Sequence, residues 1–385
     1  MLKPARKWAG FYIFEKTYAL KPRYLIFFLL VTLFKVTFCQ VSEFDKTRAI
    51  SSFNLQYNTL NFWPHNDTLI ALKKGLFQNI EVDALFSLKG SKNWHWAYKL
   101  PQVGVSLNYY NFGNNKVLGN GLGVYPFMII KLAKSSKLDL NFRYGGGIVY
   151  ISKIYEANHY PTNIAISTPI NILIDFRVNL VYHFNRNIDL QLSALANHIS
   201  NGAIKKPNYG LNSMGFGVGF TYKLNDAEPI KTPPSNFILK QPYILLTGTG
   251  AVKEVGDAGG PKYYPLSLLI TYIKPLSSII ELGASLDITY DKSVRFHLRK
   301  NGLNYNPPND DYSIGLSTRL TLPLDKLSIF GDLGIYLYQP NPRFPKVYQR
   351  IGTSYSILRN TSIVISLKTH YNIADHIEFG IAFQL

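Results

Sequence analysis

The residues best suited to chemistry lie in one short segment, from Asn197 to Asn212. Within it, His198 and Ser200 are two positions apart, so on an extended strand both side chains leave the same face, with Cα atoms ~6.6–6.8 Å apart. At that separation a serine hydroxyl and an imidazole can approach hydrogen-bonding distance, which is the arrangement that activates a serine. The pair is therefore a candidate for nucleophilic catalysis.

Other kinds of chemistry have no signature in the sequence. It contains no Gly-x-Ser-x-Gly, HExxH, CxxC or Walker motif, and the Gly248 and Gly250 pair lacks the third glycine of a dinucleotide-binding loop. No His, Asp or Glu cluster has metal-ligand spacing, and the single Cys excludes both a disulfide scaffold and a cysteine metal cluster. We therefore expect neither a metal nor a cofactor.

Strands with a period of two must position His198 and Ser200. From Ile188 to Ser200 apolar residues alternate with polar ones, with Leu195 the one apolar exception. The same alternation recurs near 213–224, 313–322 and 377–385. These strands run to about ten residues or more, whereas strands of a soluble sandwich usually have ~5–6, so they are long enough to cross a membrane.

The composition agrees with a membrane barrel. The chain has 385 residues, of which 17% are charged, and it contains 27 Tyr and 24 Phe. Its 46% hydrophobic content excludes a disordered chain, and the lack of any ~20-residue apolar run excludes a helical membrane protein. A mean hydropathy of -0.01 suits strands that alternate apolar and polar residues. The sequence thus predicts an all-β fold, a transmembrane antiparallel outer-membrane β-barrel.

An export segment precedes the strands. The largely apolar run Tyr24–Phe34 is followed by Thr37-Phe38-Cys39, with small residues at the -3 and -1 positions of a cleavage site. Six basic residues come before this run: Lys3, Arg6, Lys7, Lys16, Lys21 and Arg23. We expect residues 1–39 to be a signal peptide for a protein of the cell outer membrane. Cys39 could instead be a lipidation site, although Phe38 fits a lipoprotein signal poorly.

Sixteen candidate strands follow from about residue 51 to the end, at the upper limit of an expected 12–16. Tight turns such as Asn185-Arg186 alternate with longer loops, which we assign to the extracellular side. These loops span 153–163, 202–211, 294–309 and 340–345. The Pro-rich connection 225–236 either links two eight-stranded barrels or is one long turn in a larger barrel. We favour the single barrel, because two small barrels in tandem would be unusual.

The charge balance indicates the class of partner. The chain has 41 Lys and Arg against 23 Asp and Glu, a net charge of +18. A basic exported protein favours anionic partners such as phosphorylated lipid head groups. No nucleic acid partner is expected, because the basic residues are dispersed and the export signal points away from the cytoplasm.

The run Asn197-His198-Ile199-Ser200-Asn201, followed by Pro207-Asn208-Tyr209-Gly210, resembles a family pattern. It is similar to the His-x-Ser-Asn and Pro-Asn-x-Gly segments of the lipid A 3-O-deacylase (PagL-type), or acyloxyacyl hydrolase, family of outer-membrane barrels. These enzymes remove an ester-linked acyl chain from lipopolysaccharide. The likeness covers roughly residues 77–225, with weaker support from Asn163 to Ser167.

The resemblance implies a division of the chain and a substrate. Residues 40–225 would contain the eight-stranded deacylase-like part with the catalytic segment. The resemblance says nothing about the half of the chain after residue 236; from the alternation alone, residues 226–385 would supply additional strands, in the same barrel or in a second one. The substrate would be lipid A of lipopolysaccharide.

The resemblance also implies the roles of three residues. Ser200 would be the nucleophile, His198 the general base, and the residue at position 212 the group that orients the imidazole. Here the sequence departs from the family pattern, which has Glu where this chain has Asn212. An amide oxygen can still accept from the imidazole N–H, but it stabilises an imidazolium less than a carboxylate does. Alternatively, a carboxylate such as Glu156 reaches in from a neighbouring loop.

The same segment offers further candidates for binding. Asn201 and the backbone N–H of Gly202 would stabilise the oxyanion. Lys205 and Lys206 would hold lipid A phosphates, with Asn208 beside them as a further substrate-binding residue.

The alternation predicts which way the site faces. His198 and Ser200 continue the apolar row of their strand, and counting back from Met214 places Asn212 on the lipid side as well. Polar residues on a membrane-facing surface are costly placements, which favours an enzyme that acts on lipid. The alternative function is a non-catalytic barrel, a porin or binding protein, for which lumen-facing positions would be expected.

Overall fold

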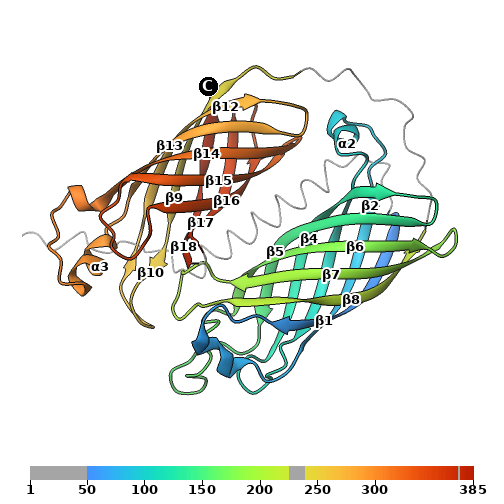
Figure 1. The fold of residues 1–385 in the computed structure, drawn as a ribbon, viewed down its shortest axis with the longest axis horizontal. Coiled ribbons are helices and arrows are strands. Elements are labelled where there is room, and N and C mark those ends of the chain that lie inside the picture. Colours follow the sequence, from blue (N-terminus) through green and yellow to red (C-terminus); the bar gives the residue numbers. More distant parts are fainter. Residues whose placement is uncertain (1–49, 225–238, 372) are drawn as a thin grey trace, which may run out of the picture. The chain divides into compact units, whose positions relative to one another are not determined.

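The computed structural model describes residues 50–224, 239–371 and 373–385. Within these ranges the chain forms two closed antiparallel barrels, each of eight strands (Figure 1). The prediction of an all-β barrel protein is confirmed. The expected signal peptide lies outside the described residues.

The first barrel contains the candidate segment and is drawn from blue to green in Figure 1. Its strands are β1 (Ser52–Phe62), β2 (Phe77–Ser87), β3 (Gln102–Asn111), β4 (Asn120–Lys134), β5 (Leu138–Ile151), β6 (Ile170–His183), β7 (Ile188–Ser200) and β8 (Leu211–Lys223). The 3-10 helix η1 (Asp67–Leu72) lies between β1 and β2, and helix α2 (Asn93–Ala97) lies between β2 and β3.

The second barrel is drawn from yellow to red in Figure 1. Its strands are β9 (Tyr243–Ala251), β12 (Leu266–Pro275), β13 (Glu281–Tyr290), β14 (Tyr312–Leu324), β15 (Leu327–Tyr338), β16 (Val347–Ser356), β17 (Thr361–His370) and β18 (Ile373–Gln384). Its connections carry a small sheet of β10 (Lys253–Glu254) and β11 (Lys262–Tyr263), helix α3 (Val294–Lys300) and the 3-10 helix η2 (Asn309–Asp311).

The preference for a single large barrel is wrong. Strand β1 pairs with β8 in continuous antiparallel register, from Ser52 opposite Lys223 to Phe62 opposite Ser213, so the first sheet closes after eight strands. Strand β18 closes the second sheet against β9 in the same way. Closure satisfies the backbone hydrogen bonds of the edge strands, and eight strands leave an interior that side chains can fill. The Pro-rich connection 225–236 lies outside the described residues.

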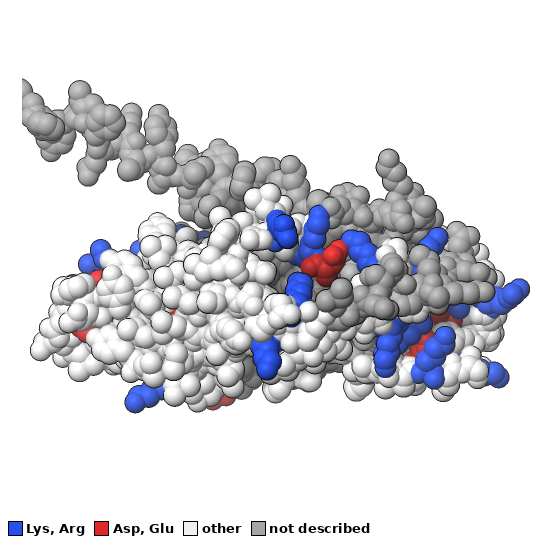
Figure 2. Space-filling model, turned by 90° about the horizontal axis from the view of Figure 1, so that it is seen from above, with Lys and Arg blue, Asp and Glu red and all other residues white. Residues whose placement is uncertain are grey.

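The alternation along each strand separates a polar lumen from an apolar outer wall. In β7 the side chains of Asp189, Gln191 and Ser193 are buried, whereas Leu190 and Leu192 between them are 45% and 57% exposed. Much of the surface of the described residues in Figure 2 carries neither acidic nor basic side chains. An apolar band of this kind is what a lipid bilayer requires of a barrel's outer face.

A buried ionic network fills the middle of the first barrel. The Arg177 guanidinium lies 2.9 Å from carboxylate oxygens of Glu81 and Asp175, and Arg143 lies 2.7 Å from Asp83. All of these side chains are almost fully buried. Buried charges are tolerated only when they are paired. The network therefore fills the lumen, and the loss of one member would leave its partner as an unpaired buried charge.

The second barrel has a comparable network. Arg350 pairs with Glu378 at 2.6 Å and with Asp287 at 2.9 Å, and Arg319 pairs with Asp332 at 2.7 Å. These side chains are also almost fully buried. Both lumens are therefore occupied by fixed charges of both signs.

The first barrel has a short-turn end and a long-loop end. The β4–β5 and β6–β7 turns, 135–137 and 184–187, lie at one end, together with the longer β2–β3 connection 88–101 that carries α2. All connections at the opposite end are longer than these two turns and comprise 63–76, 112–119, 152–169 and 201–210. Strand β7 runs toward the long-loop end, so Ser200 lies there. None of the helices among the described residues has the length and apolar character needed to span a membrane.

Candidate active site

Ser200 and His198 are in hydrogen-bonding contact at the end of β7. The Ser200 Oγ lies 2.9 Å from the His198 Nε2. By the alternation of the strand, both residues continue the outward row of Leu190 and Leu192; at this end of the row His198 is half-buried and Ser200 is buried. The sequence predicted that the two side chains lie close together and on the outward side of the strand, and the geometry agrees. A barrel that uses these residues to line a pore would require the opposite face.

Asn212 of β8 supplies the second partner of the imidazole. It stands directly opposite His198 in the β7–β8 register, and its Oδ1 lies 2.6 Å from the His198 Nδ1. An amide oxygen can only accept, so the Nδ1 carries the ring hydrogen in this arrangement and the Nε2 is left to accept the Ser200 hydroxyl proton. Ser200, His198 and Asn212 thus form a linear chain of the kind found in serine hydrolases.

The loop after β7 folds back over the pair, and Gly210 makes this possible. Gly210 has a φ of +76°, and a Cβ at this position would lie 3.0 Å from the His198 Cε1 and 3.3 Å from the Ser200 Cβ. Only glycine combines this left-handed backbone with so close an approach. The Gly210 N–H donates to the Ala165 carbonyl at 2.9 Å, which ties the loop to the segment that precedes β6.

Asn201 is engaged within the loop. Its side-chain Nδ2 donates to the Ser167 Oγ and to the Lys205 carbonyl, each at 3.1 Å, and its backbone N–H donates to the Asn208 Oδ1 at 3.1 Å. The Asn201 donors therefore hold the loop in shape. Asn208 accepts one of them, so in this structure it braces the same loop, and its substrate-binding role stays a prediction.

Gly202 retains a free backbone donor. It has a φ of +60°, and its N–H donates no hydrogen bond within the described residues. Gly202 is buried, and its role as an oxyanion donor stays a prediction. Lys205 in the same loop has an exposed side chain, and that of Lys206 is half-buried; their binding of phosphate stays a prediction.

The loop carboxylate Glu156 is paired within its own loop. It is exposed and lies 3.2 Å from His159. Instead, Asn212 contacts a residue that the sequence reading missed: its Nδ2 lies 3.0 Å from the Nδ1 of His65, in the connection between β1 and β2. His65 is 147 positions from Asn212 in the chain, so no local pattern could have revealed the contact. Barrel closure between β1 and β8 brings the two together.

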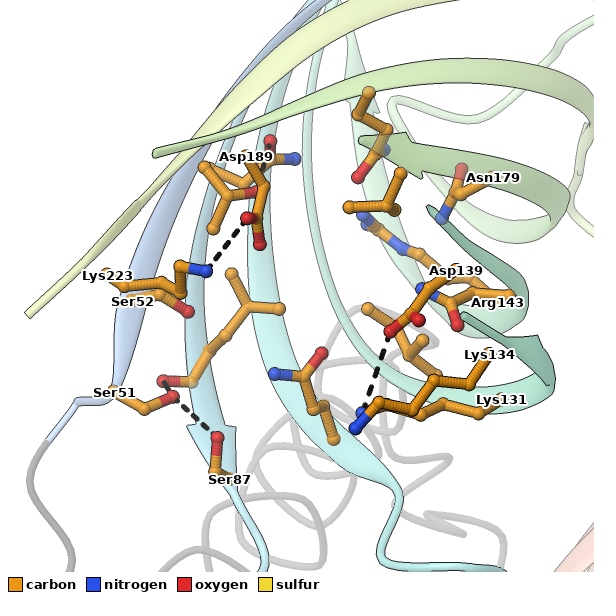
Figure 3. A pocket seen from close by; sticks show the side chains of 18 of the residues that line it. Ser51, Ser52, Ser87, Lys131, Lys134, Asp139, Arg143, Asn179, Asp189 and Lys223 are labelled. Atoms are coloured by element: carbon orange, nitrogen blue, oxygen red, sulfur yellow. Dashed lines mark hydrogen bonds and ion pairs between the residues drawn. The ribbon is translucent and has the colours of Figure 1, made fainter. Parts of the chain in front are cut away.

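A cavity of about 720 Å³ lies at the other end of the first barrel (Figure 3). Its polar walls include the Lys223–Asp189 pair at 2.8 Å and the Lys131–Asp139 pair at 3.8 Å. Asp189 and Ser200 stand at opposite ends of β7, ~36 Å apart along the strand. This lumenal cavity is therefore separate from the Ser200 site. Among the described residues, no group of three or more His, Cys, Asp or Glu could hold a metal ion.

Comparison with family models gives two matches. Residues 78–221 match the model described as lipid A 3-O-deacylase (PagL). Residues 242–385 match the model described as acyloxyacyl hydrolase, C-terminal domain. The first match contains all of the site except His65, and the second spans the strands of the second barrel.

Comparison with solved structures gives further likenesses. Neisserial surface protein A is 10% identical with a TM-score of 0.32, and the match covers 46% of this chain and all of that one. The outer membrane enzyme PagL is 12% identical with a TM-score of 0.31, and the match covers 45% of this chain and all of that one. Comparison with curated protein sequences finds no match.

Proposed function

Because residues 78–221 match the family model described as lipid A 3-O-deacylase (PagL), we propose that this outer-membrane β-barrel protein is a serine esterase that removes the 3-O-linked acyl chain of lipid A. The observation that carries the proposal is the chain of contacts from Ser200 through His198 to Asn212 on the outward face of the first barrel. A nucleophile on that face meets acyl chains in the bilayer, whereas a lumenal one would not.

In the first step the Ser200 Oγ attacks the carbonyl carbon of the acyl ester. The His198 Nε2, 2.9 Å away, takes the hydroxyl proton, while its Nδ1–H donates to the Asn212 Oδ1. When the tetrahedral intermediate collapses, the C–O bond to the sugar breaks and His198 returns the proton to the departing lipid A hydroxyl. The acyl group is then esterified to Ser200.

Water completes the cycle. His198 takes a proton from a water molecule, which attacks the acyl-enzyme carbonyl, and then returns the proton to the Ser200 Oγ as the fatty acid leaves. In both steps the negative oxygen of the intermediate is stabilised by the N–H of Gly202. In serine hydrolases, the removal of one such donor typically lowers turnover by roughly 10²–10³-fold.

The outer wall below Ser200 suits an extended acyl chain. Ala194 and Ala196 follow His198 along the outward row, and Ala196 stands between Phe176 of β6 and Met214 of β8. Farther along the row, Ala194 lines an open, largely apolar hollow of the outer wall with Val178 and Phe216, where an acyl chain would lie. Lys205 and Lys206, in the loop above, would face the lipid A phosphates. Export to the outer membrane would depend on residues 1–39 as a signal peptide.

The proposal is tested by mass spectrometry of lipid A from cells that produce the protein. We expect lipid A that has lost one hydroxyacyl chain in cells with the parent protein, and intact lipid A with Ser200→Ala or His198→Ala. Ser213→Ala is the matched control, because Ser213 is a buried serine on the lumenal face of β8, next to Asn212. Its lipid A should resemble that of the parent. Deacylation by folded Ser200→Ala would contradict the mechanism.

A further inference from the structure

His65 is held next to Asn212 by structure on both sides. The backbone N–H of Trp63 donates to the Asn212 carbonyl at 2.8 Å, which continues the β1–β8 pairing past the end of β1. One residue after His65, the Asn66 side chain accepts from the Thr68 N–H at 3.0 Å and caps helix η1. In that helix Leu69 and Leu72 are buried. The imidazole of His65 is therefore presented to Asn212 by a braced connection.

The contact with His65 determines which end of the Asn212 amide, oxygen or nitrogen, faces His198. The Asn212 Nδ2 can only donate, so the His65 Nδ1, 3.0 Å away, must accept, and His65 must be neutral. The opposite end of the amide, Oδ1, then faces His198. The two ends of an amide have nearly the same shape, so hydrogen-bond partners alone decide which of them faces His198.

We propose that His65 is a positioning residue for the serine esterase chemistry: as a neutral acceptor it holds the Asn212 amide with its oxygen toward His198. The inference rests on the proposed function. A protonated His65 can only donate, so Asn212 must then turn its oxygen to His65 and its N–H groups to His198. His198 would carry its hydrogen on Nε2, where it can no longer accept the proton of Ser200.

The surroundings of His65 agree with a neutral ring. Partial burial lowers the pKa of His65 below its usual value of 6.5. His198, beyond Asn212, interacts electrostatically with His65, and Asp67 lies two residues along the connection. A carboxylate at position 212 would need no such partner, because both of its oxygens accept. His65 thus supplies an orientation that an amide needs and a carboxylate does not.

The test is a set of variants at position 65 in two backgrounds, the parent and the isosteric Asn212→Asp. His65→Phe keeps a ring but removes the acceptor, and His65→Lys places a permanent donor there. In the parent background we expect kcat on lipid A micelles to fall about 3- to 10-fold with His65→Phe, the effect of one neutral hydrogen bond, and further with His65→Lys. KM should not change. In the Asn212→Asp background both changes should alter kcat less than about 2-fold.

The pH profile and the ring nitrogens of His198 provide readouts that a merely structural role would not move. Because two histidines must be neutral, the acid limb of log kcat should approach a slope of 2 in the parent and a slope of 1 in His65→Phe. Nitrogen-15 NMR should show a hydrogen on the His198 Nδ1 in the parent and on Nε2 in His65→Lys.

Equal losses of kcat in both backgrounds, or no loss with His65→Lys, would overturn the inference. So would an unchanged His198 tautomer in His65→Lys. If the parent itself leaves lipid A intact, the proposed function fails, but the NMR comparison still decides whether His65 orients Asn212.

Discussion

Gly210→Ala tests whether the loop must lie directly against the Ser200–His198 pair. The change has two costs. The φ of +76° is a left-handed conformation, which costs a residue with a Cβ about 1–2 kcal/mol of folding free energy. The new Cβ would also lie 3.0 Å from the His198 Cε1 and 3.1 Å from the Ile199 carbonyl oxygen, so the ring must move by a few tenths of an ångström.

Such a shift lengthens and bends the 2.9 Å contact between the His198 Nε2 and the Ser200 Oγ, which weakens the hydrogen bond that activates the serine. A misplacement of 1 Å can cost about 10²-fold in rate, so we expect Gly210→Ala to lower kcat roughly 10-fold. The assay is initial-rate release of fatty acid from lipid A in mixed micelles, alongside thermal unfolding in detergent.

Gly302→Ala is the matched control. Gly302 has a φ of +68° but nothing within 4 Å of an added Cβ. It should therefore lose a similar amount of stability and retain the parent kcat. Parent-like activity in Gly210→Ala, or an equal loss of activity in Gly302→Ala, would refute the claim that the close approach at Gly210 acts on the catalytic pair.

Three further outcomes follow from the structure. Asn212→Glu should preserve or raise kcat, Asn212→Ala should lower it, and Glu156→Ala should have no effect. If Glu156→Ala is inactive and Asn212→Ala keeps the parent kcat, the group that orients His198 lies in the loop instead. Arg177→Ala removes the 2.9 Å partner of the buried Asp175 and leaves Glu81 with Arg143 alone, so it should lower the free energy of unfolding by about 3–5 kcal/mol, measured by denaturation in detergent. Lys131→Ala removes a more exposed ion pair with a longer contact, so it should lower the free energy of unfolding by less than about 1 kcal/mol. Equal losses in Arg177→Ala and Lys131→Ala would contradict the claim that burial sets the cost. The pKa of His65, measured by NMR, should lie below 6.5, because burial disfavours the charged form of the ring. Asn212→Asp should raise this pKa through the added negative charge. A pKa above 6.5 in the parent would contradict the role of His65 as a neutral acceptor.

The facing of the site was predictable because a strand has a period of two. The alternation through Leu190 and Leu192 assigns the face of His198 and Ser200, and counting back along β8 from Met214 assigns the same face to Asn212. These are local relations, which a sequence carries directly.

The closure of the barrel after eight strands and the hydrogen bonds within the β7–β8 loop could not be predicted in this way. The β1–β8 pairing joins Ser52 to Lys223, and a larger barrel would have the same alternation, so nothing local distinguishes the two. The contact between His65 and Asn212 depends on that closure. Asn201 was expected to serve the oxyanion, but its donors satisfy the Ser167 hydroxyl, the Lys205 carbonyl and Asn208 within the loop. Only coordinates reveal which donors a folded loop uses for itself.

The central claim is that Ser200 is a nucleophile activated by His198. It is tested most directly by treating the folded protein in detergent with a fluorophosphonate, which bonds to an activated serine oxygen with loss of fluoride, and locating the adduct by peptide mass spectrometry. The account predicts one adduct, on Ser200, that is lost in His198→Ala and unaffected by Ser213→Ala. An adduct on another residue whose formation abolishes lipid A deacylation, with Ser200 unmodified, would contradict it.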